Sequence, residues 1–244
     1  MTKTYIEPIA MLPFGMLNAF LLVQDQKAVL VDTGLPKAAN HVAKALKKHG
    51  LNWAHIKLIV LTHGHIDHAG SAVSLRALTG APVLAHAGDL PYFEGKAPVL
   101  HPTGMFGRLF FKTGAIQQPF DYFTPDHVMT DDALDLAPFG FDARILRTPG
   151  HTPGSVSVLL NDRRVIAGDL AASGILLGGI ALRSCPKQPP FEEAPKTVAA
   201  SLERLVSLGY EQFYLGHGGP LASSMIEKHI RFLRRLPAQP SGAS

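Results

Sequence analysis

Apolar runs separated by short polar turns predict how the first part of the chain is built. Residues 19–23 and 28–31 are apolar and flank the polar turn 24–27, a pattern typical of a β-hairpin. After this hairpin, Pro36 can open a helix with an apolar stripe, and Gly50 can end it. The first elements are therefore expected to be two strands and a helix.

The next apolar run, residues 56–61, predicts a strand, and the positions after it suit a helix that reaches about Leu78. Gly80 can stop this helix, and residues 82–85 are expected to form another short strand. The first half is thus expected to run in the order ββαβαβ.

The second half shows the same kind of apolar pattern. Strands are expected over 143–146, 155–160, 164–167 and 212–215, and helices around 198–206 and over 224–236. Ile226, Ile230 and Leu233 share one side of the last helix, as expected for a helix packed on a sheet. Two sheets packed face to face, with helices outside, would bury both sets of apolar residues.

We expect a single domain over residues 1–236, because 244 residues of which 46% are hydrophobic can bury a full core. Its halves are expected at about 1–125 and 126–236, and residues 237–244 should form a flexible tail. Segment 90–125 has no clean period and is rich in aromatic residues. Long irregular segments in compact domains are usually functional loops or lids.

Composition narrows the chemistry. The only cysteine is Cys185, so neither an intramolecular disulfide nor a thiolate metal cluster can form, and any metal must be held by nitrogen and oxygen. The formal charge of +4 is small and dispersed, so no nucleic acid is expected as a partner. The apolar stretch 9–23 is interrupted by Pro13 and Gly15 and is too short to span a membrane. A cytoplasmic protein is expected.

The segment 62–68 carries the strongest chemical signal, with three histidines and an aspartate directly after the strand 56–61. His63 and His65 are alternate residues of an extended turn and can point the same way, while Asp67 and His68 face a neighbouring point. A rigid strand end is a good support for such a metal site. This segment could therefore contribute to two adjacent ions.

Three more polar residues stand beside glycines at the ends of elements, where the backbone can approach a ligand closely: His151, Asp169 and His217. With the segment 62–68 they make five histidines and two aspartates. These donors suffice for two zinc ions with positions left open for water, as a catalytic zinc site requires.

These residues resemble the metallo-β-lactamase-fold hydrolase superfamily, whose HxHxDH motif reads here as His63, His65, Asp67 and His68. The resemblance extends from Asp32-Thr33-Gly34 to His217 and implies an α/β (α+β) fold, an αββα sandwich of two mixed sheets flanked by helices. It also implies a set of metal ligands: His63, His65 and His151 for the first ion, Asp67, His68 and His217 for the second, and Asp169 as a bridge. Two Zn²⁺ per chain are expected, with iron or manganese as alternatives.

The implied reaction is hydrolysis, in which a hydroxide shared by the two metals attacks a carbonyl. Asp67 could act both as a ligand and as the catalytic proton acceptor. In this family the turn that holds Asp32 lies beside the site, so a hydrogen bond from a metal-binding histidine to Asp32 is one reading, and simple turn formation is the other.

Subfamily patterns narrow the substrate. Resemblance to true β-lactamases weakens at Asp169, because those enzymes lack this bridging aspartate, so antibiotic hydrolysis is at best a side activity. Flavin-linked di-iron oxygen reductases have glutamate at the position of His65, which argues against that class. Glyoxalase II enzymes share all seven ligands but append a helical domain after them, whereas small lactonases match in length and ligands. We expect a dinuclear zinc hydrolase of esters, lactones or thioesters.

Three alternatives remain open at this point. They are a zinc phosphodiesterase or nuclease, a single-iron oxygenase resembling persulfide dioxygenases, which use only the positions of His63, His151 and Asp169, and a binding module without catalysis. The expected partner is a small-molecule substrate, and a homodimer stays open.

Segment 90–125 and the apolar run 175–182 are candidates for a lid and an entry wall, with packing on the sandwich or a dimer contact as the alternative. Arg183 and Lys187 could meet an anionic substrate, although a solvated loop is the simpler reading. The remaining histidines are expected to be surface or structural residues with satisfied hydrogen bonds: His41, His49, His55, His86, His101, His127 and His229.

Overall fold

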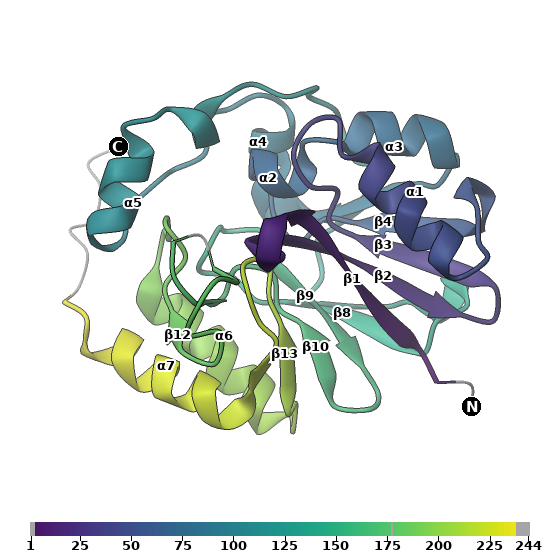
Figure 1. The fold of residues 1–244 in the computed structure, drawn as a ribbon. Helices are drawn as coiled ribbons and strands as arrows, with labels where there is room; N and C mark the ends of the chain where they lie inside the picture. The colour runs from purple at the N-terminus through teal and green to yellow at the C-terminus, as the bar shows by residue number, and fades with distance from the viewer. Residues whose placement is uncertain (1–2, 177, 238–244) are drawn as a thin grey trace.

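Two six-stranded β-sheets pack face to face, with helices on their outer faces (Figure 1). The computed structural model describes residues 3–176 and 178–237. The αββα sandwich expected from the resemblance is confirmed, with the two sheets inside and the helices outside as the apolar pattern predicts.

The first sheet contains, in spatial order, β1 (Tyr5–Leu12), β2 (Leu17–Gln24), β3 (Lys27–Val31), β4 (Ile56–Val60), β5 (Val83–His86) and β6 (His127–Met129). β1, β2 and β3 pair antiparallel, and β3 to β6 run parallel. The predicted hairpin is β2–β3, in which Phe20 stands opposite Val31 and Gln24 opposite Lys27.

The second sheet contains, in spatial order, β14 (Leu221–Ala222), β13 (Gln212–Tyr214), β10 (Arg164–Ile166), β9 (Val156–Leu160), β8 (Ala143–Arg147) and β7 (Ala133–Asp135). A separate ribbon joins β11 (Ala172–Ser173) to β12 (Pro186–Lys187). An isolated bridge links Ala172 of this ribbon to His217, so the ribbon lies beside the end of the second sheet.

Two helices cover each sheet. α1 (Ala39–Lys48) and α3 (Ala72–Thr79) lie on the first sheet, and α6 (Pro195–Ser207) and α7 (Ser223–Arg235) lie on the second (Figure 1). Shorter helices are α2 (Ile66–Ala69), α4 (Leu90–Phe93) and α5 (Gly104–Phe111), and the 3₁₀ turns are η1 (Pro13–Gly15), η2 (Trp53–His55), η3 (Ala87–Asp89), η4 (Ala115–Gln117) and η5 (Ala137–Phe139). In the described part of the chain, no helix is long and apolar enough to cross a membrane.

The core forms three apolar layers because the central strands are buried on both faces. In β2, Phe20 and Leu22 face the second sheet, whereas Leu21 between them packs toward α1 and α3. On the far side, Leu159 of β9 packs against Leu202 of α6 and its neighbours. Alternate side chains of a strand point to opposite faces, so burial on both faces gives continuous apolar runs.

Some boundaries differ from the expected ones. α1 begins at Ala39, three residues after Pro36, and the helix expected after the strand 56–61 is divided into α2 and α3. Gly70 lies at the division, where a Cβ atom would approach the carbonyl oxygen of Ile66 and the ring of Pro36 within 2.4 and 2.5 Å. The close contact with Pro36 thus requires glycine and sets the turn between the two helices.

The aromatic segment 90–125 contains α4, α5 and η4 and combines packed and exposed residues. Phe93 and Phe123 belong to the core under α3, and Ile116 packs against Ile66 of the metal-binding segment. Met105 of α5, in contrast, is 79% exposed. One part of the segment therefore packs on the sandwich, while α5 presents apolar side chains to solvent.

Candidate metal centre

The seven predicted ligands meet where strands of both sheets end. His63, His65, Asp67 and His68 follow β4, His151 lies between β8 and β9, Asp169 follows β10, and His217 follows β13. Six of the seven side chains are buried, and Asp67 is the partly exposed member. Segments from both halves of the chain therefore contribute to one cluster.

Three imidazoles converge on one point of this cluster. The Nε2 atoms of His63 and His151 lie 3.2 Å apart, and Nδ1 of His65 lies 3.2 Å from the same His151 nitrogen. Two nitrogens that each bind a tetrahedral ion at about 2.1 Å lie about 3.4 Å apart. The spacing of the three rings therefore suits one metal ion held between them.

A second group of donors faces the first. Oδ2 of Asp67 lies 3.4 Å from Nε2 of His217 and 3.9 Å from Nε2 of His68. Oδ1 of Asp169 lies 3.5 Å from Nε2 of His68. Oδ2 of Asp169 lies 3.1 Å from Nε2 of His217 and 3.8 Å from Nε2 of His151. Asp169 thus faces both groups, because its Oδ2 lies near His151 of the first group and His217 of the second.

Hydrogen bonds fix the orientation of several of these rings. Asp32 Oδ2 accepts from Nδ1 of His68 at 2.8 Å, and the Asp32 carboxylate also accepts from the amide and hydroxyl of Thr62. The Thr62 hydroxyl, which donates to Asp32, accepts from Nδ1 of His63 at 3.0 Å. Nδ1 of His217 donates to the carbonyl of Met16 at 2.5 Å. In each ring the other nitrogen keeps a lone pair aimed at the cluster.

Burial keeps the first three histidines neutral. Removal from water lowers the pKa of His65 to about 4 and of His151 to about 3, and lowers the pKa of His63 well below its usual value. The like charges that the neighbouring rings would carry act in the same direction for His63. Neutral imidazoles are the form that binds metal.

The second group has the opposite electrostatics. Burial disfavours protonation of His68, but Asp169, Asp32 and Asp67 outweigh it and raise the pKa of His68 to about 9. Asp169 and Asp67 likewise raise the pKa of His217 well above its usual value despite burial. In return, His68 and His217 hold the pKa of Asp67 at about 2 against the effect of burial. Positive charge is therefore strongly favoured at this point, as a divalent cation would supply it.

The residues fit a metal pair in two further respects. Several buried polar atoms have no hydrogen-bond partner among the described residues, including Nε2 of His68, Oδ1 of Asp67 and Oδ1 of Asp169. Gly216 leaves the room they occupy, because a Cβ atom there would lie 2.2 Å from Asp169 Oδ1 and 2.6 Å from Cε1 of His68. Buried unpaired donors that converge in this way are expected where ligands face a metal.

Sequence reasoning missed Asp89, which ties two of the metal-binding loops together. Its carboxylate accepts from the amide of Gly64 at 2.8 Å, the hydroxyl of Thr152 at 2.7 Å and the amide of Gly154 at 2.7 Å. Burial nevertheless raises the pKa of Asp89 to about 6. Asp89 follows the strand β5 just as the predicted ligands follow their strands. This position is the sequence signal that could have identified it.

Asn18 holds the loop of His217 from the other side. Its amide donates to the carbonyls of Leu215 at 3.1 Å and Gly218 at 3.0 Å, and the amide of Gly218 donates to the carbonyl of Gly15. A buried asparagine inside an apolar strand was the signal for this role. η1 and the end of β13 are joined as a result.

Two glutamates, the buried Glu192 and the partly buried Glu193, lie between the metal centre and the 90–125 segment. Burial raises the pKa of Glu192 to about 8 and of Glu193 to about 7, and the charge of Asp169 adds to the effect at Glu192. Glu193 accepts from the hydroxyl of Tyr92 at 2.9 Å. The sequence analysis singled out neither glutamate.

Of the other histidines, two differ from the expectation of a surface or satisfied residue. His86 and His229 are buried, and Nε2 of each has no hydrogen-bond partner among the described residues. The hydrogen bond from His68 to Asp32, which was one of two readings of the sequence, is present. Arg183 is exposed, as expected for a solvated loop, whereas Lys187 is partly buried.

Comparison with known proteins begins with the family. The model of the metallo-beta-lactamase superfamily matches residues 12–217. Among curated relatives, the probable metallo-hydrolase YflN of Bacillus subtilis is 30% identical over 203 residues, covering 79% of this chain and 76% of that protein. The hydroxyacylglutathione hydrolase GloC of Haemophilus influenzae is 28% identical over 173 residues, covering 70% of this chain and 72% of its own.

Two solved structures share the fold. The B3 metallo-beta-lactamase BLEG-1 has a TM-score of 0.69 at 24% identity and covers 94% of this chain and 99% of its own. The structure of TTHA1623 in a di-iron-bound form has a TM-score of 0.62 at 26% identity, covering 93% of this chain and 99% of that chain. With most of its length matched, this chain belongs to the metallo-beta-lactamase superfamily and is a metal-dependent hydrolase.

Proposed function

We propose that the chain is a dinuclear zinc hydrolase that cleaves a carbonyl ester, lactone or thioester. The observation that carries the proposal is the place of Asp169, whose Oδ2 lies near His151 of the first group and His217 of the second, while its Oδ1 lies near His68 of the second. A carboxylate between two groups of neutral or carboxylate-paired imidazoles is suited to bridge two ions.

His63, His65 and His151 would hold one ion, Asp67, His68 and His217 the other, and Asp169 both. When bound, such a pair supplies a water of lowered pKa and a polarising charge for the substrate oxygen. Asp67 is the partly exposed member of the set, and its Oδ1 has no partner among the described residues. We assign Asp67 a second role, acceptance of the proton from the attacking water at Oδ1.

A pocket next to the metal-binding segment supports an acyl or aromatic substrate. It has a volume of about 250 Å³, and Gly64 and Ile66 line it together with Tyr92, Phe120 and Tyr122 of the segment 90–125. Its walls combine these apolar and aromatic residues with the polar side chains of Lys96, Gln117 and Gln118, and small-molecule sites commonly combine the two. We therefore place the entry of the substrate at this pocket.

The relatives bear on the choice of substrate and of metal. GloC is named a hydroxyacylglutathione hydrolase, and its substrate class is a thioester. This relative therefore supports a substrate with a reactive carbonyl. TTHA1623 holds two irons, and the nitrogen and oxygen donors of this chain accept zinc, iron or manganese. Hydrolysis of β-lactams is retained as a side activity only.

A substrate panel tests the reaction. Metal-loaded chain should hydrolyse at least one ester, lactone or thioester at least about a hundredfold faster than a β-lactam or a phosphodiester. His63→Ala and Asp169→Ala should lose this turnover, while Asp135→Asn at an exposed turn should keep it. Turnover of the phosphodiester alone, or full activity of both ligand variants, would overturn the proposal.

A further inference from the structure

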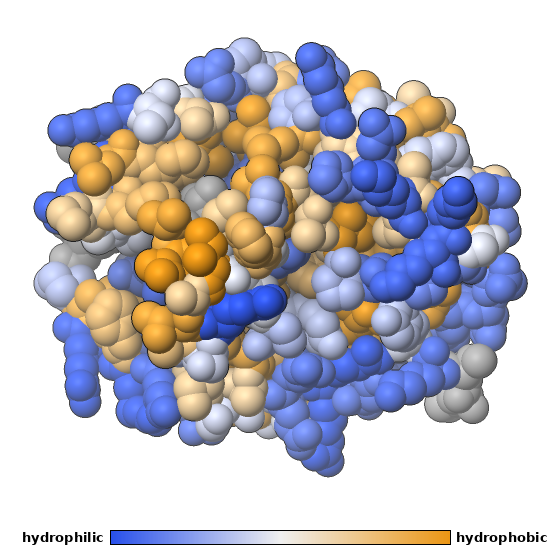
Figure 2. Space-filling model, viewed as in Figure 1, coloured by the Kyte–Doolittle hydropathy of each residue, from blue (hydrophilic) through white to orange (hydrophobic). Residues whose placement is uncertain are grey.

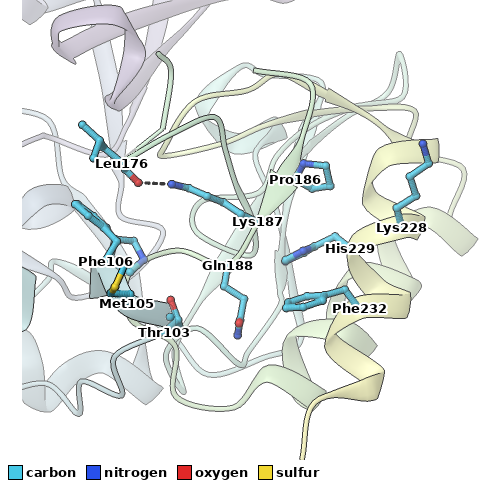
Figure 3. Close-up of a pocket in the computed structure, with 12 residues that line it drawn as sticks. Thr103, Met105, Phe106, Leu176, Pro186, Lys187, Gln188, Lys228, His229 and Phe232 are labelled. Carbon is cyan, nitrogen blue, oxygen red and sulfur yellow. Dashed lines mark hydrogen bonds between the residues drawn. The ribbon is translucent and has the colours of Figure 1, made fainter. Parts of the chain in front are cut away.

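A second and larger pocket lies between α5, the loop that leads into β12, and α7 (Figure 3). Its volume is about 480 Å³, within the range of small-molecule sites. None of the seven predicted metal ligands lines it. Its apolar walls are formed chiefly by Met105, Phe106, Leu176 and Phe232. Figure 2 shows apolar side chains gathered over this side of the molecule.

Lys187 supplies a cation inside these apolar walls. Its Nζ atom donates to the carbonyl of Leu176 and lies 5.9 Å from the centre of the Phe106 ring. No carboxylate pairs with this amine among the described residues, and burial lowers the pKa of Lys187. A partly buried cation without a counter-ion gains most from an anion brought by a ligand.

His229 supplies a second polar group from the opposite wall. Its side chain is 2% exposed, and its ring stacks on that of Phe232 with 6.1 Å between the centres. Nε2 has no hydrogen-bond partner among the described residues. Burial lowers the pKa of His229 to about 4, so the ring is neutral and can donate one N–H bond to a ligand. A buried polar group of this kind normally has a partner.

The directions of the side chains favour an anion with an apolar part. In Figure 3, Lys187 extends from β12 toward Leu176 and Phe106, and His229 and Phe232 enter from α7 on the other side. Lys228 points away from the space between them. One available cation suits a monoanion, whereas a phosphate dianion would leave charge unpaired in apolar surroundings.

We propose that this pocket binds a small amphipathic monocarboxylate, with the carboxylate on the Lys187 amine and an aliphatic chain or aromatic ring on the apolar walls between Phe106 and Phe232. The ribbon β11–β12 separates this site from the metal centre, because Lys187 pairs with Ala172, which bridges to His217. Binding here needs no turnover, so the proposal stands independently of the reaction assigned above.

Calorimetry on the metal-loaded full chain tests the proposal with octanoate as the probe. Octanoate should bind at least tenfold more tightly than octan-1-ol, which lacks the charge, and than acetate, which lacks the chain. Lys187→Met should weaken octanoate binding at least tenfold. Lys112→Met, an exposed lysine just after α5, should leave it unchanged.

Several outcomes would overturn the proposal. Equal affinity for octanoate and octan-1-ol would show that the apolar walls alone bind the probe. Equal affinity for octanoate and acetate would show that the carboxylate binds at the metal centre instead of this pocket. Wild-type affinity in folded Lys187→Met, or no binding by the wild type, would disprove a carboxylate site at Lys187. A dimer that Phe232→Asp dissociates would assign these walls to a second copy of the chain instead.

Discussion

At the scale of single residues, Asp32 controls the ring of a predicted ligand without being a ligand. Its carboxylate, 1% exposed, accepts from His68 Nδ1 and from the amide and hydroxyl of Thr62. Such a carboxylate orients the imidazole and raises the basicity of the nitrogen that faces the metal. The same Asp32 carboxylate therefore stabilises its turn and accepts the hydrogen bond from His68.

We expect Asp32→Ala to weaken metal binding roughly 10- to 100-fold, because His68 loses the acceptor that fixes its orientation. Asp32→Asn keeps an acceptor for Nδ1 and should lose less affinity. Titration against a competing chelator measures both variants. Wild-type affinity in Asp32→Ala would contradict the role assigned to this carboxylate.

Glu192 makes stability depend on pH in a predictable direction. Burial raises the pKa of Glu192 from 4.5 to about 8, and the charge of Asp169 contributes. Between these values the folded chain keeps the carboxyl protonated while the unfolded chain ionises it. The folded state therefore loses stability as the pH rises from about 4.5 to 8, whereas below 4.5 nothing is lost.

Glu192→Gln mimics the protonated carboxyl and should remove this loss. Its stability relative to wild type should rise with pH across the window, by at most about 1.4 kcal/mol per pH unit. Urea unfolding of metal-free protein at pH 5, 6, 7 and 8 measures the difference. Glu227→Gln at an exposed position should show no trend, and a flat difference for Glu192→Gln would disprove a protonated Glu192 in the fold.

At the scale of elements, Asp89 joins the loop after β4 to the loop between β8 and β9. Asp89→Asn can accept at only one oxygen and should leave the amide of Gly64 or Gly154 without a partner. We expect destabilisation of about 1 to 3 kcal/mol and faster hydrogen exchange at the amide that loses its acceptor. Asp135→Asn, where the aspartate serves an exposed turn, is the control. Unchanged hydrogen exchange at both glycine amides would show that Asp89 does not hold the two loops together.

The elements predicted from sequence are those with a strong periodic or apolar signal. β4, β9 and α7 follow from apolar runs or stripes, since burial on one or both faces sets the pattern. β1 was not predicted, because Pro8 lies inside it. This strand tolerates a proline because it is at the edge of the sheet, with β2 as its neighbour. β11 and β12 have two residues each and carry no period.

The candidate site divides in the same way. The HxHxDH segment is a local pattern, so it could be found by spacing, and His151, Asp169 and His217 could be found beside their glycines. Asp89 carries the same mark, since it stands beside Gly88 after β5, but Glu192 has none, because burial and the charge of Asp169 set its pKa. The two pockets also form only when separate segments meet.

At the scale of the whole molecule, metal should stabilise a fold that exists without it. The three apolar layers give the chain a core of its own, so chelated protein should still unfold cooperatively. Metal at about a thousandfold above its dissociation constant adds about 4 kcal/mol. For a chain of this size that corresponds to roughly 8 to 16 °C in Tm. Scanning calorimetry before and after chelation measures the shift, and an unchanged Tm would contradict a metal held by buried ligands.

The arrangement of the whole chain also supports our proposal of one domain over 1–236, with halves at about 1–125 and 126–236 that each supply ligands. The seven predicted ligands join segments from both halves, so neither half should bind the metal pair alone. β6, at residues 127–129, completes the first sheet and lies close to the proposed boundary.

The central claim is that one chain holds two metal ions at once. Elemental mass spectrometry of protein purified without added metal, against an independent protein concentration, tests it most directly. We predict two divalent ions per wild-type chain and about one in His217→Ala, which keeps the three histidines of the first group. A single iron per wild-type chain, unchanged in His217→Ala, would contradict the dinuclear account and favour a single-iron oxygenase.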